Sequence, residues 1–270
     1  MESKREIKRR VLNVSAAVLA LFIVFLLSRF YTLFGAAVFP ESLPVYCDAA
    51  AWALFLFAGA AVLYGAYRPP VTAEGEVGAA APPRRKKPLY LVPVTVFLLL
   101  TLDLSVSFFG QGGNALPDLR GGELVLRAVL GCTVYPFCEE TFFRGVLLSA
   151  VREKDDPPPV RLAAVLLTAA AFAFFHRDGG FLFALAAGAV LSIPAPYGAA
   201  GPARFSPPFG PIAAHAAYNL ALYSAAALAR AGVDPLLTVS AFAGAAAAAA
   251  GIMILAGGKN AKRRKDKKDN

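Results

Sequence analysis

Eight long stretches of apolar residues follow one another along the chain, and polar segments separate them. A helix needs about 20 apolar residues to cross a bilayer, and most of the stretches approach that length. The predicted spans are residues 11–34, 47–67, 89–109, 123–151, 162–176, 181–193, 212–229 and 236–256. The pattern therefore predicts an all-α fold, a polytopic bundle of about eight transmembrane helices.

Composition and charge agree with a membrane protein. Of the 270 residues, 57% are hydrophobic and 17% are charged, whereas a soluble domain has about 25% charged residues. The net charge of +9 comes from Lys and Arg gathered at both ends of the chain and in the run 84–87. This clustering is typical of the positive-inside rule and argues against nucleic acid as a partner. We expect membrane lipids as partners, both termini in the cytoplasm, and location in the cell (plasma) membrane.

The polar segments divide the chain into four parts. Residues 1–67 are predicted to form a two-span hairpin with a basic N-terminus. Its first apolar run is longer than the core of a signal peptide, so we interpret it as an uncleaved signal anchor. Residues 68–88 predict a flexible, basic cytoplasmic linker, residues 89–257 a six-span core, and residues 258–270 a basic, disordered cytoplasmic tail.

Three charged side chains lie inside the fourth predicted span, namely Glu139, Glu140 and Arg144. Charged residues are rare within membrane spans and usually face an interior cavity. On a helix Glu140 and Arg144 stand at positions i and i+4, so they share a face and can pair, while Glu139 points about 100° away. One carboxylate can therefore be neutralised while its neighbour stays free to act. A purely structural ion pair is the alternative.

The chain contains two histidines, His176 and His215, and both lie in predicted spans. Phe172 precedes His176 by four residues, and Asn219 follows His215 by four, so each pair shares a helix face. A histidine at a helix end, or a histidine and an asparagine that link two helices, can be purely structural. Their occurrence together with the buried carboxylates favours a shared site.

Taken in order, these residues resemble the three motifs of the CPBP intramembrane proteases, also called the ABI family, which includes the CAAX-processing endopeptidases. The resemblance covers about residues 123–229. The matching motifs are Glu139-Glu140-x-x-x-Arg144, Phe172-x-x-x-His176 and His215-x-x-x-Asn219, with Gly145 continuing the first.

The resemblance implies an endopeptidase whose active site lies in an intramembrane cavity. Glu139 and His176 would activate a water that attacks a peptide carbonyl, and His215 and Asn219 would stabilise the oxyanion. Glu140 belongs to the same catalytic set. The supporting residues implied are Arg144, which with Glu140 would hold the first motif in shape, and Phe172.

A metal would be held by Glu139, His176 and His215, because two histidines and a glutamate form a ligand set known from zinc hydrolases. The motif His-Glu-x-x-His on one helix is absent from the sequence. The resemblance to CAAX endopeptidases favours a glutamate-activated water without metal, and zinc is the alternative cofactor.

The depth of His215 sets a geometric condition on the shared site. This residue lies only three positions into its predicted span, so we expect segment 192–211 to dip into the membrane and form the mouth of the cavity. Glu139 and His215 must flank one reacting carbonyl, so they cannot lie more than about 12 Å apart.

Two functions of other classes compete with a peptidase of membrane-associated or lipidated proteins and peptides. Buried Glu, His and Arg residues also build proton relays, so a proton-coupled transporter is one alternative. It requires further polar residues along a conduit, for which only Asp103 and Arg127 stand out as buried candidates. A non-catalytic scaffold or immunity-type membrane protein is the other.

Overall fold

A computed structural model of the chain describes residues 4–38, 44–66, 88–108, 121–152, 156–176, 180–195 and 207–266. Every regular element in these ranges is a helix, which confirms the all-α prediction. The elements are α1 (Lys4–Val38), α2 (Pro44–Ala66), α3 (Leu91–Phe108), α4 (Gly121–Cys132), α5 (Val134–Glu140), the π-helix η1 (Thr141–Leu147), α6 (Leu148–Val151), α7 (Pro158–Phe175), α8 (Phe181–Leu191), α9 (Phe209–Ala229) and α10 (Pro235–Asp266).

Six helices in the described part of the chain are long and apolar enough to cross a membrane: α1, α2, α3, α7, α9 and α10. The other two predicted spans differ. Residues 123–151 are divided among α4, α5, η1 and α6, and the stretch 181–193 is reduced to the 11-residue helix α8. A helix of that length rises about 16 Å, roughly half of the hydrocarbon core.

The break between α4 and α5 falls at Thr133, whose backbone leaves the helical region (φ −127°, ψ −72°). Pro136 explains the break. Proline has no N–H to donate to the carbonyl of Cys132, and its ring would clash with that carbonyl in a continuous helix. The sequence around the two glutamates is thereby placed on a separate short helix.

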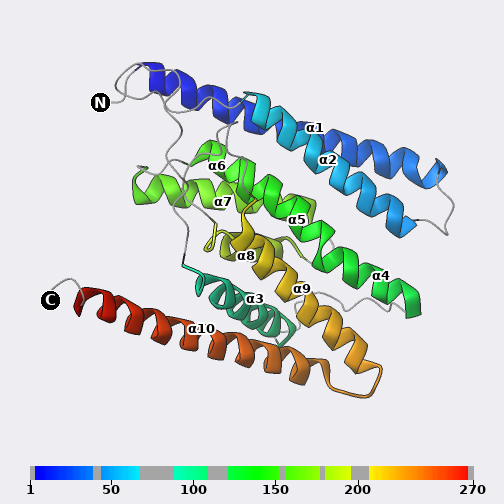
Figure 1. Cartoon of the computed structure of the whole chain (residues 1–270). Coiled ribbons are helices and arrows are strands. Elements are labelled where there is room, and N and C mark those ends of the chain that lie inside the picture. Colours follow the sequence, from blue (N-terminus) through cyan, green and yellow to red (C-terminus); the bar gives the residue numbers. More distant parts are fainter. Residues whose placement is uncertain are drawn as a thin grey trace.

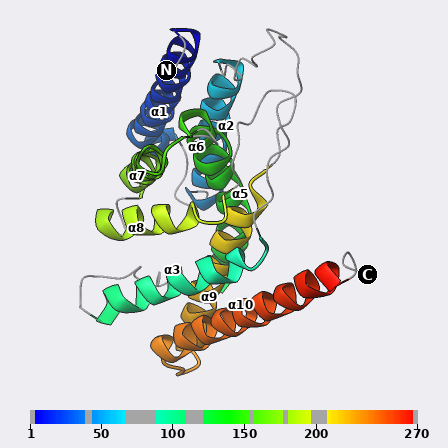
Figure 2. The same cartoon turned by 90° about the vertical axis from the view of Figure 1, so that its left-hand side faces the viewer.

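The helices form layers, with the α1–α2 hairpin on one side, the pair α3 and α10 on the other, and α5 to α9 between them (Figures 1 and 2). The beginning of α1 and the end of α10 lie at the same end of the bundle (Figure 1). This agrees with an even number of crossings. The cytoplasmic location of that end stays a prediction.

The structure describes most of the predicted C-terminal tail but almost none of the predicted linker. Residues 67–87, which hold nearly all of the predicted linker, lie outside the described residues. The predicted disordered tail is in fact helical as far as Asp266, because α10 continues through it. Lys, Arg and Ala are good helix formers, and no proline follows Pro235 to end the helix.

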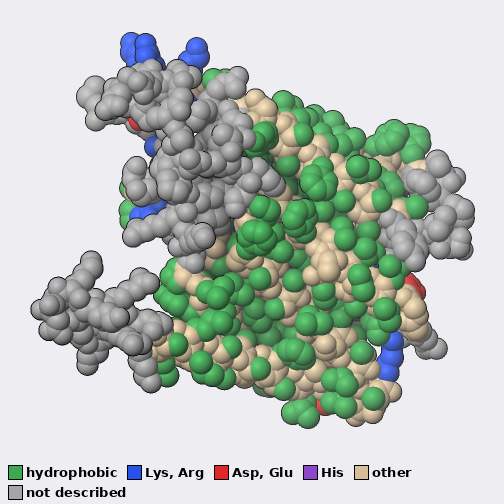
Figure 3. Space-filling model, viewed as in Figure 1, with side chains coloured by type: hydrophobic (Ala, Val, Ile, Leu, Met, Phe, Trp, Pro, Cys, Tyr) green, Lys and Arg blue, Asp and Glu red, His purple; other side chains and the backbone are tan. Residues whose placement is uncertain are grey.

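The core is built from side chains of both the hairpin and the central layer. Val24 of α1, Leu56 of α2 and Phe142 of η1 belong to one buried cluster together with residues of α3, α5 and α7 to α10. Gly59 makes the contact close, since a Cβ atom there would lie 2.6 Å from Val24 and 2.7 Å from Phe142. The visible outer face is mostly hydrophobic, with Lys and Arg near its ends (Figure 3), as expected for a surface in contact with lipid.

Candidate active site

Both glutamates of the first motif lie at the end of α5, where the chain continues as the π-helix η1. Glu139 is 5% exposed and Glu140 is fully buried. The π-helix covers residues 141–147, all of them buried. Such wider turns are rare and are frequently found at functional sites. Two adjacent carboxylates are therefore held inside the protein on an irregular helix.

The predicted ion pair between Glu140 and Arg144 is present and fully buried. Arg144 Nη1 lies 2.9 Å from Glu140 Oε1, and Arg144 Nη2 donates to the carbonyl of Gly188 in α8 at 2.8 Å. The guanidinium also stacks over the ring of Phe172, 4.5 Å from its centroid. Arg144 thus neutralises one carboxylate and ties η1 to α7 and α8.

His215, on the first turns of α9, lies within reach of both glutamates but closer to Glu140. Its Nδ1 is 2.9 Å from Glu140 Oε1 and 3.9 Å from Glu139 Oε2. The separation from Glu139 is far below the limit of about 12 Å for a shared site. Because a carboxylate only accepts, Nδ1 of His215 is the nitrogen that carries a proton.

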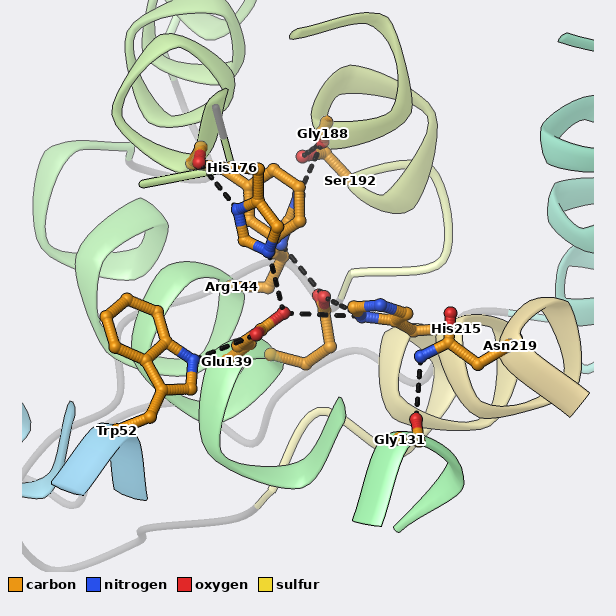
Figure 4. Close-up of polar contacts among 11 residues, drawn as sticks. Trp52, Gly131, Glu139, Arg144, His176, Gly188, Ser192, His215 and Asn219 are labelled. Carbon is orange, nitrogen blue, oxygen red and sulfur yellow. Dashed lines mark hydrogen bonds and ion pairs between the residues drawn. The ribbon is translucent and has the colours of Figure 1, made fainter. Parts of the chain in front are cut away.

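His176 directly follows the last residue of α7. Its Nδ1 donates to the carbonyl of Phe172 at 2.8 Å, and its ring stacks on the Phe172 ring with centroids 3.9 Å apart. Its Nε2 then faces Glu139 Oε2 at 3.4 Å (Figure 4). A neutral imidazole in this tautomer presents a lone pair to a carboxylate oxygen. Two acceptor atoms cannot bond each other directly, so Nε2 and Oε2 are both left to receive a hydrogen from a third group.

Asn219 lies one turn after His215 on α9 and has a partner in another helix. Its Nδ2 donates to the carbonyl of Gly131 in α4 at 2.6 Å (Figure 4). An amide carries two N–H donors, so this bond uses one and fixes the side chain. Asn219 also lines the cavity described next.

A cavity of about 320 Å³ opens beside these residues. Glu139, His176, His215 and Asn219 lie on its wall together with Tyr135 and Tyr218. The rest of the wall is apolar and comes from α3, α7 and α8: Leu99, Phe172, Phe175, Phe183, Ala184, Ala187 and Leu191. The polar motifs therefore meet at one end of a hydrophobic space between helices.

The segment expected to dip inward, 192–211, is described only at its two ends. Ala195 is fully buried, and a Cβ atom on Gly210 would lie 2.9 Å from the carbonyl oxygen of Pro194. Both ends thus pack into the protein. Residues 196–206, on which most of the predicted cavity mouth falls, lie outside the described residues.

Residues 121–221 match the protein family described as type II CAAX prenyl endopeptidase, Rce1-like. The resemblance to the CAAX-type intramembrane proteases is confirmed. We call residues 121–221 the Rce1-like segment. Searches among curated proteins and among solved structures gave no match. Together with this match, the six apolar helices of the described residues show that the chain is an integral membrane protein.

All seven motif residues lie within the Rce1-like segment, whereas Trp52, which contacts Glu139, lies outside it. Trp52 of α2 donates its indole Nε1–H to Glu139 Oε1 at 2.9 Å (Figure 4). The motifs gave no sign of this contact. The available signal was that the chain has a single tryptophan and places it in an apolar helix, where its N–H needs an acceptor.

Of the two residues considered for a proton relay, Asp103 adjoins the cavity through Tyr218, and Arg127 does not line it. Asp103 is buried in α3 and accepts a hydrogen bond from Tyr218 at 3.2 Å. Arg127, expected to be buried, is 41% exposed at its side chain and pairs with Glu123 one turn away.

Three ligand atoms of the type that holds a metal lie within 4.8 Å of one another, from Glu139, Glu140 and His215. The ligand set predicted from the sequence was Glu139, His176 and His215. The set found in the structure contains Glu140 instead of His176. Glu140 Oε1 is engaged by both Arg144 and His215. Glu139 Oε2 and Glu140 Oε2 are buried, and neither has a hydrogen-bond partner among the described residues.

Proposed function

We propose that this protein is an intramembrane endopeptidase that hydrolyses peptide bonds of membrane-associated or lipidated proteins and peptides. The Rce1-like segment supports the class of reaction. The observation that carries the proposal is the position of Glu139 Oε2, which faces His176 at 3.4 Å and His215 at 3.9 Å on the wall of a largely apolar cavity.

Glu139 and His176 would activate the attacking water. Each lines the cavity with an acceptor atom, and a water on the cavity side of the pair can donate one hydrogen to each. When its oxygen attacks the carbonyl carbon, one proton passes to this pair. The pair returns a proton to the amine nitrogen as the C–N bond breaks, so the water is divided between the two products.

His215 and Asn219 would stabilise the negative charge that develops on the carbonyl oxygen. Nδ1 of His215 already donates its hydrogen to Glu140. The oxyanion can therefore accept a hydrogen bond only from Nε2 of His215, and Nε2 carries a hydrogen only in the imidazolium form. Asn219 keeps one N–H beyond its bond to Gly131. Fixed donors of this kind need no reorganisation during the reaction.

The buried charges around the site support this division of roles. Glu140 and Arg144 neutralise each other. The negative charge of Glu139 can therefore be compensated only by a protonated histidine of the site. An uncompensated charge inside a protein is costly. With His215 as the imidazolium, the two carboxylates face two cations, Arg144 and His215.

A zinc ion does not fit these residues well, and we derive no step through a metal. Glu140 would have to bind the cation beside the permanent positive charge of Arg144, 2.9 Å away. His215 could bind only through Nε2, because its Nδ1 donates to Glu140. Some of the atoms that would bind a metal are thus already engaged in hydrogen bonds within the cluster.

The experiment that tests the function compares membranes that contain the wild type with membranes that contain Glu139→Gln. Glutamine keeps the shape of the side chain but cannot take up the proton. Mass spectrometry of membrane proteins and peptides should show precursors that accumulate only in the variant. If both proteins melt alike and the two peptide profiles coincide, the enzyme proposal is wrong and a scaffold role is favoured.

A further inference from the structure

Trp52 contacts the carboxylate to which the proposed function assigns the chemistry, although it lies in the α1–α2 hairpin outside the Rce1-like segment. The indole has a single N–H and no acceptor, and this N–H donates to Glu139 Oε1 at 2.9 Å. Glu139 comes from α5, 87 positions further along the chain.

This hydrogen bond distinguishes the two oxygens of Glu139. A terminal carboxylate rotates over a broad range of angles when nothing holds it. With Oε1 held by Trp52, Oε2 is the oxygen that faces His176 and His215. The bond from the hairpin thus selects the oxygen of Glu139 that faces His176.

The ring of Trp52 also packs against Phe175, the chain neighbour of His176. Its centroid lies 5.6 Å from that of Phe175, with the planes inclined at 51°. Phe175 is the last residue of α7 and directly precedes His176. One side chain of α2 therefore contacts both elements whose separation sets the distance between Glu139 and His176.

We propose that Trp52 is a positioning residue, and that the N-terminal hairpin completes the active site by fixing the orientation of the Glu139 carboxylate. Its effect on catalysis rests on the proposed function. The contact itself does not. If Trp52 only filled space between α2 and α5, a phenylalanine, which keeps most of the ring area against Phe175, would serve equally well.

A spectroscopic test addresses the contact without any substrate. The full chain is labelled with ¹⁵N-tryptophan in detergent micelles, and its single indole N–H resonance is recorded. Replacing the acceptor by Glu139→Leu should shift this resonance. The control, Leu54→Ala, changes a lipid-facing side chain (66% exposed) two positions from Trp52 and should leave it in place. An indole resonance that does not move in Glu139→Leu overturns the proposal.

A kinetic test addresses the consequence, with a quenched fluorogenic peptide ending in a farnesylated cysteine segment as the probe. Trp52→Phe should lower kcat about tenfold with little change in KM, because it removes a hydrogen bond to a charged group and no cavity wall. In the background of Glu139→Gln the same substitution should cost nothing further, since Trp52 acts through that carboxylate. Full activity of Trp52→Phe overturns the proposal.

The two tests separate the two proposals. A wild type that does not cleave the probe counts against the proposed function, and the indole resonance then decides on Trp52. If Trp52→Phe does not fold, the resonance in Glu139→Leu still decides, because that variant retains Trp52.

Discussion

His215 Nδ1 lies 2.9 Å from Oε1 of Glu140, the carboxylate oxygen that also receives the guanidinium of Arg144. The second histidine of the site is therefore bonded to Glu140 rather than to Glu139, the carboxylate to which the proposed function assigns the chemistry. Its distance from Glu139, 3.9 Å, leaves the cavity-facing oxygen of that residue open. Glu140 thereby links Arg144, which neutralises its buried charge, to His215, which is expected to stabilise the oxyanion.

Removing the charge of Glu140 should destabilise the whole site. Glu140→Gln leaves Arg144 buried without its counter-ion, which costs about 3–5 kcal/mol. The double variant Glu140→Gln with Arg144→Met removes both charges and should recover part of the loss. Thermal unfolding in detergent measures both. An unchanged melting temperature for the single variant would contradict the role given to the pair.

His176→Ala should abolish most of the activity without unfolding the protein. A positioned acid–base group contributes about 10²–10⁴-fold to the rate, and the side chain makes its hydrogen bond at the end of α7 rather than within it. The control is Leu167→Ala, a 70% exposed position on the same helix. Peptide cleavage and melting temperature are measured for both, and equal activities would exclude His176 from the chemistry.

Asn219→Ala should affect both stability and rate. Losing the bond to Gly131 costs about 1 kcal/mol, and loss of an oxyanion donor lowers kcat by about 10²–10³. Thr168→Ala is the matched control, because it removes a buried side-chain bond to the carbonyl of Ala164 and Thr168 does not line the cavity. If both variants lose the same small fraction of activity, Asn219 is a helix link only.

Gly188→Ala should loosen the attachment of Arg144. A Cβ atom there would lie 3.1 Å from Ala169 Cα and 3.3 Å from the Phe172 ring, and the carbonyl of Gly188 accepts from Arg144. Overpacking of this kind costs about 1–3 kcal/mol. Gly244→Ala, where nothing lies within 4 Å, should instead stabilise α10 by about 0.5–1 kcal/mol. Melting temperatures that move in the same direction would refute this contrast.

Chelators should leave the activity unchanged if the water is activated by Glu139 and His176 alone. The purified protein is incubated with 1,10-phenanthroline, assayed for peptide cleavage, and analysed for bound metal by mass spectrometry. We expect full activity and less than one zinc per chain. Loss of activity that added zinc restores would point to a metal bound through Glu139, His176 and His215.

Much of the architecture followed from local patterns. Long apolar stretches predict helices whatever their neighbours, and six of the eight are long enough to span. The fourth and sixth stretches differ because a proline within the fourth removes a backbone donor, and the sixth ends after 11 residues. The helical part of the tail shows that a basic segment following an apolar helix can extend it.

The sequence by itself determined which residue types meet, since spacing four apart on a helix sets the pairs Glu140–Arg144 and Phe172–His176 and a shared face for His215 and Asn219. These relations depend only on helix geometry. Tertiary structure decided which atoms of different helices face one another: His215 toward Glu140, Asn219 toward Gly131, and Trp52 toward Glu139. Such contacts depend on how helices cross and rotate, and no periodicity within one helix encodes that.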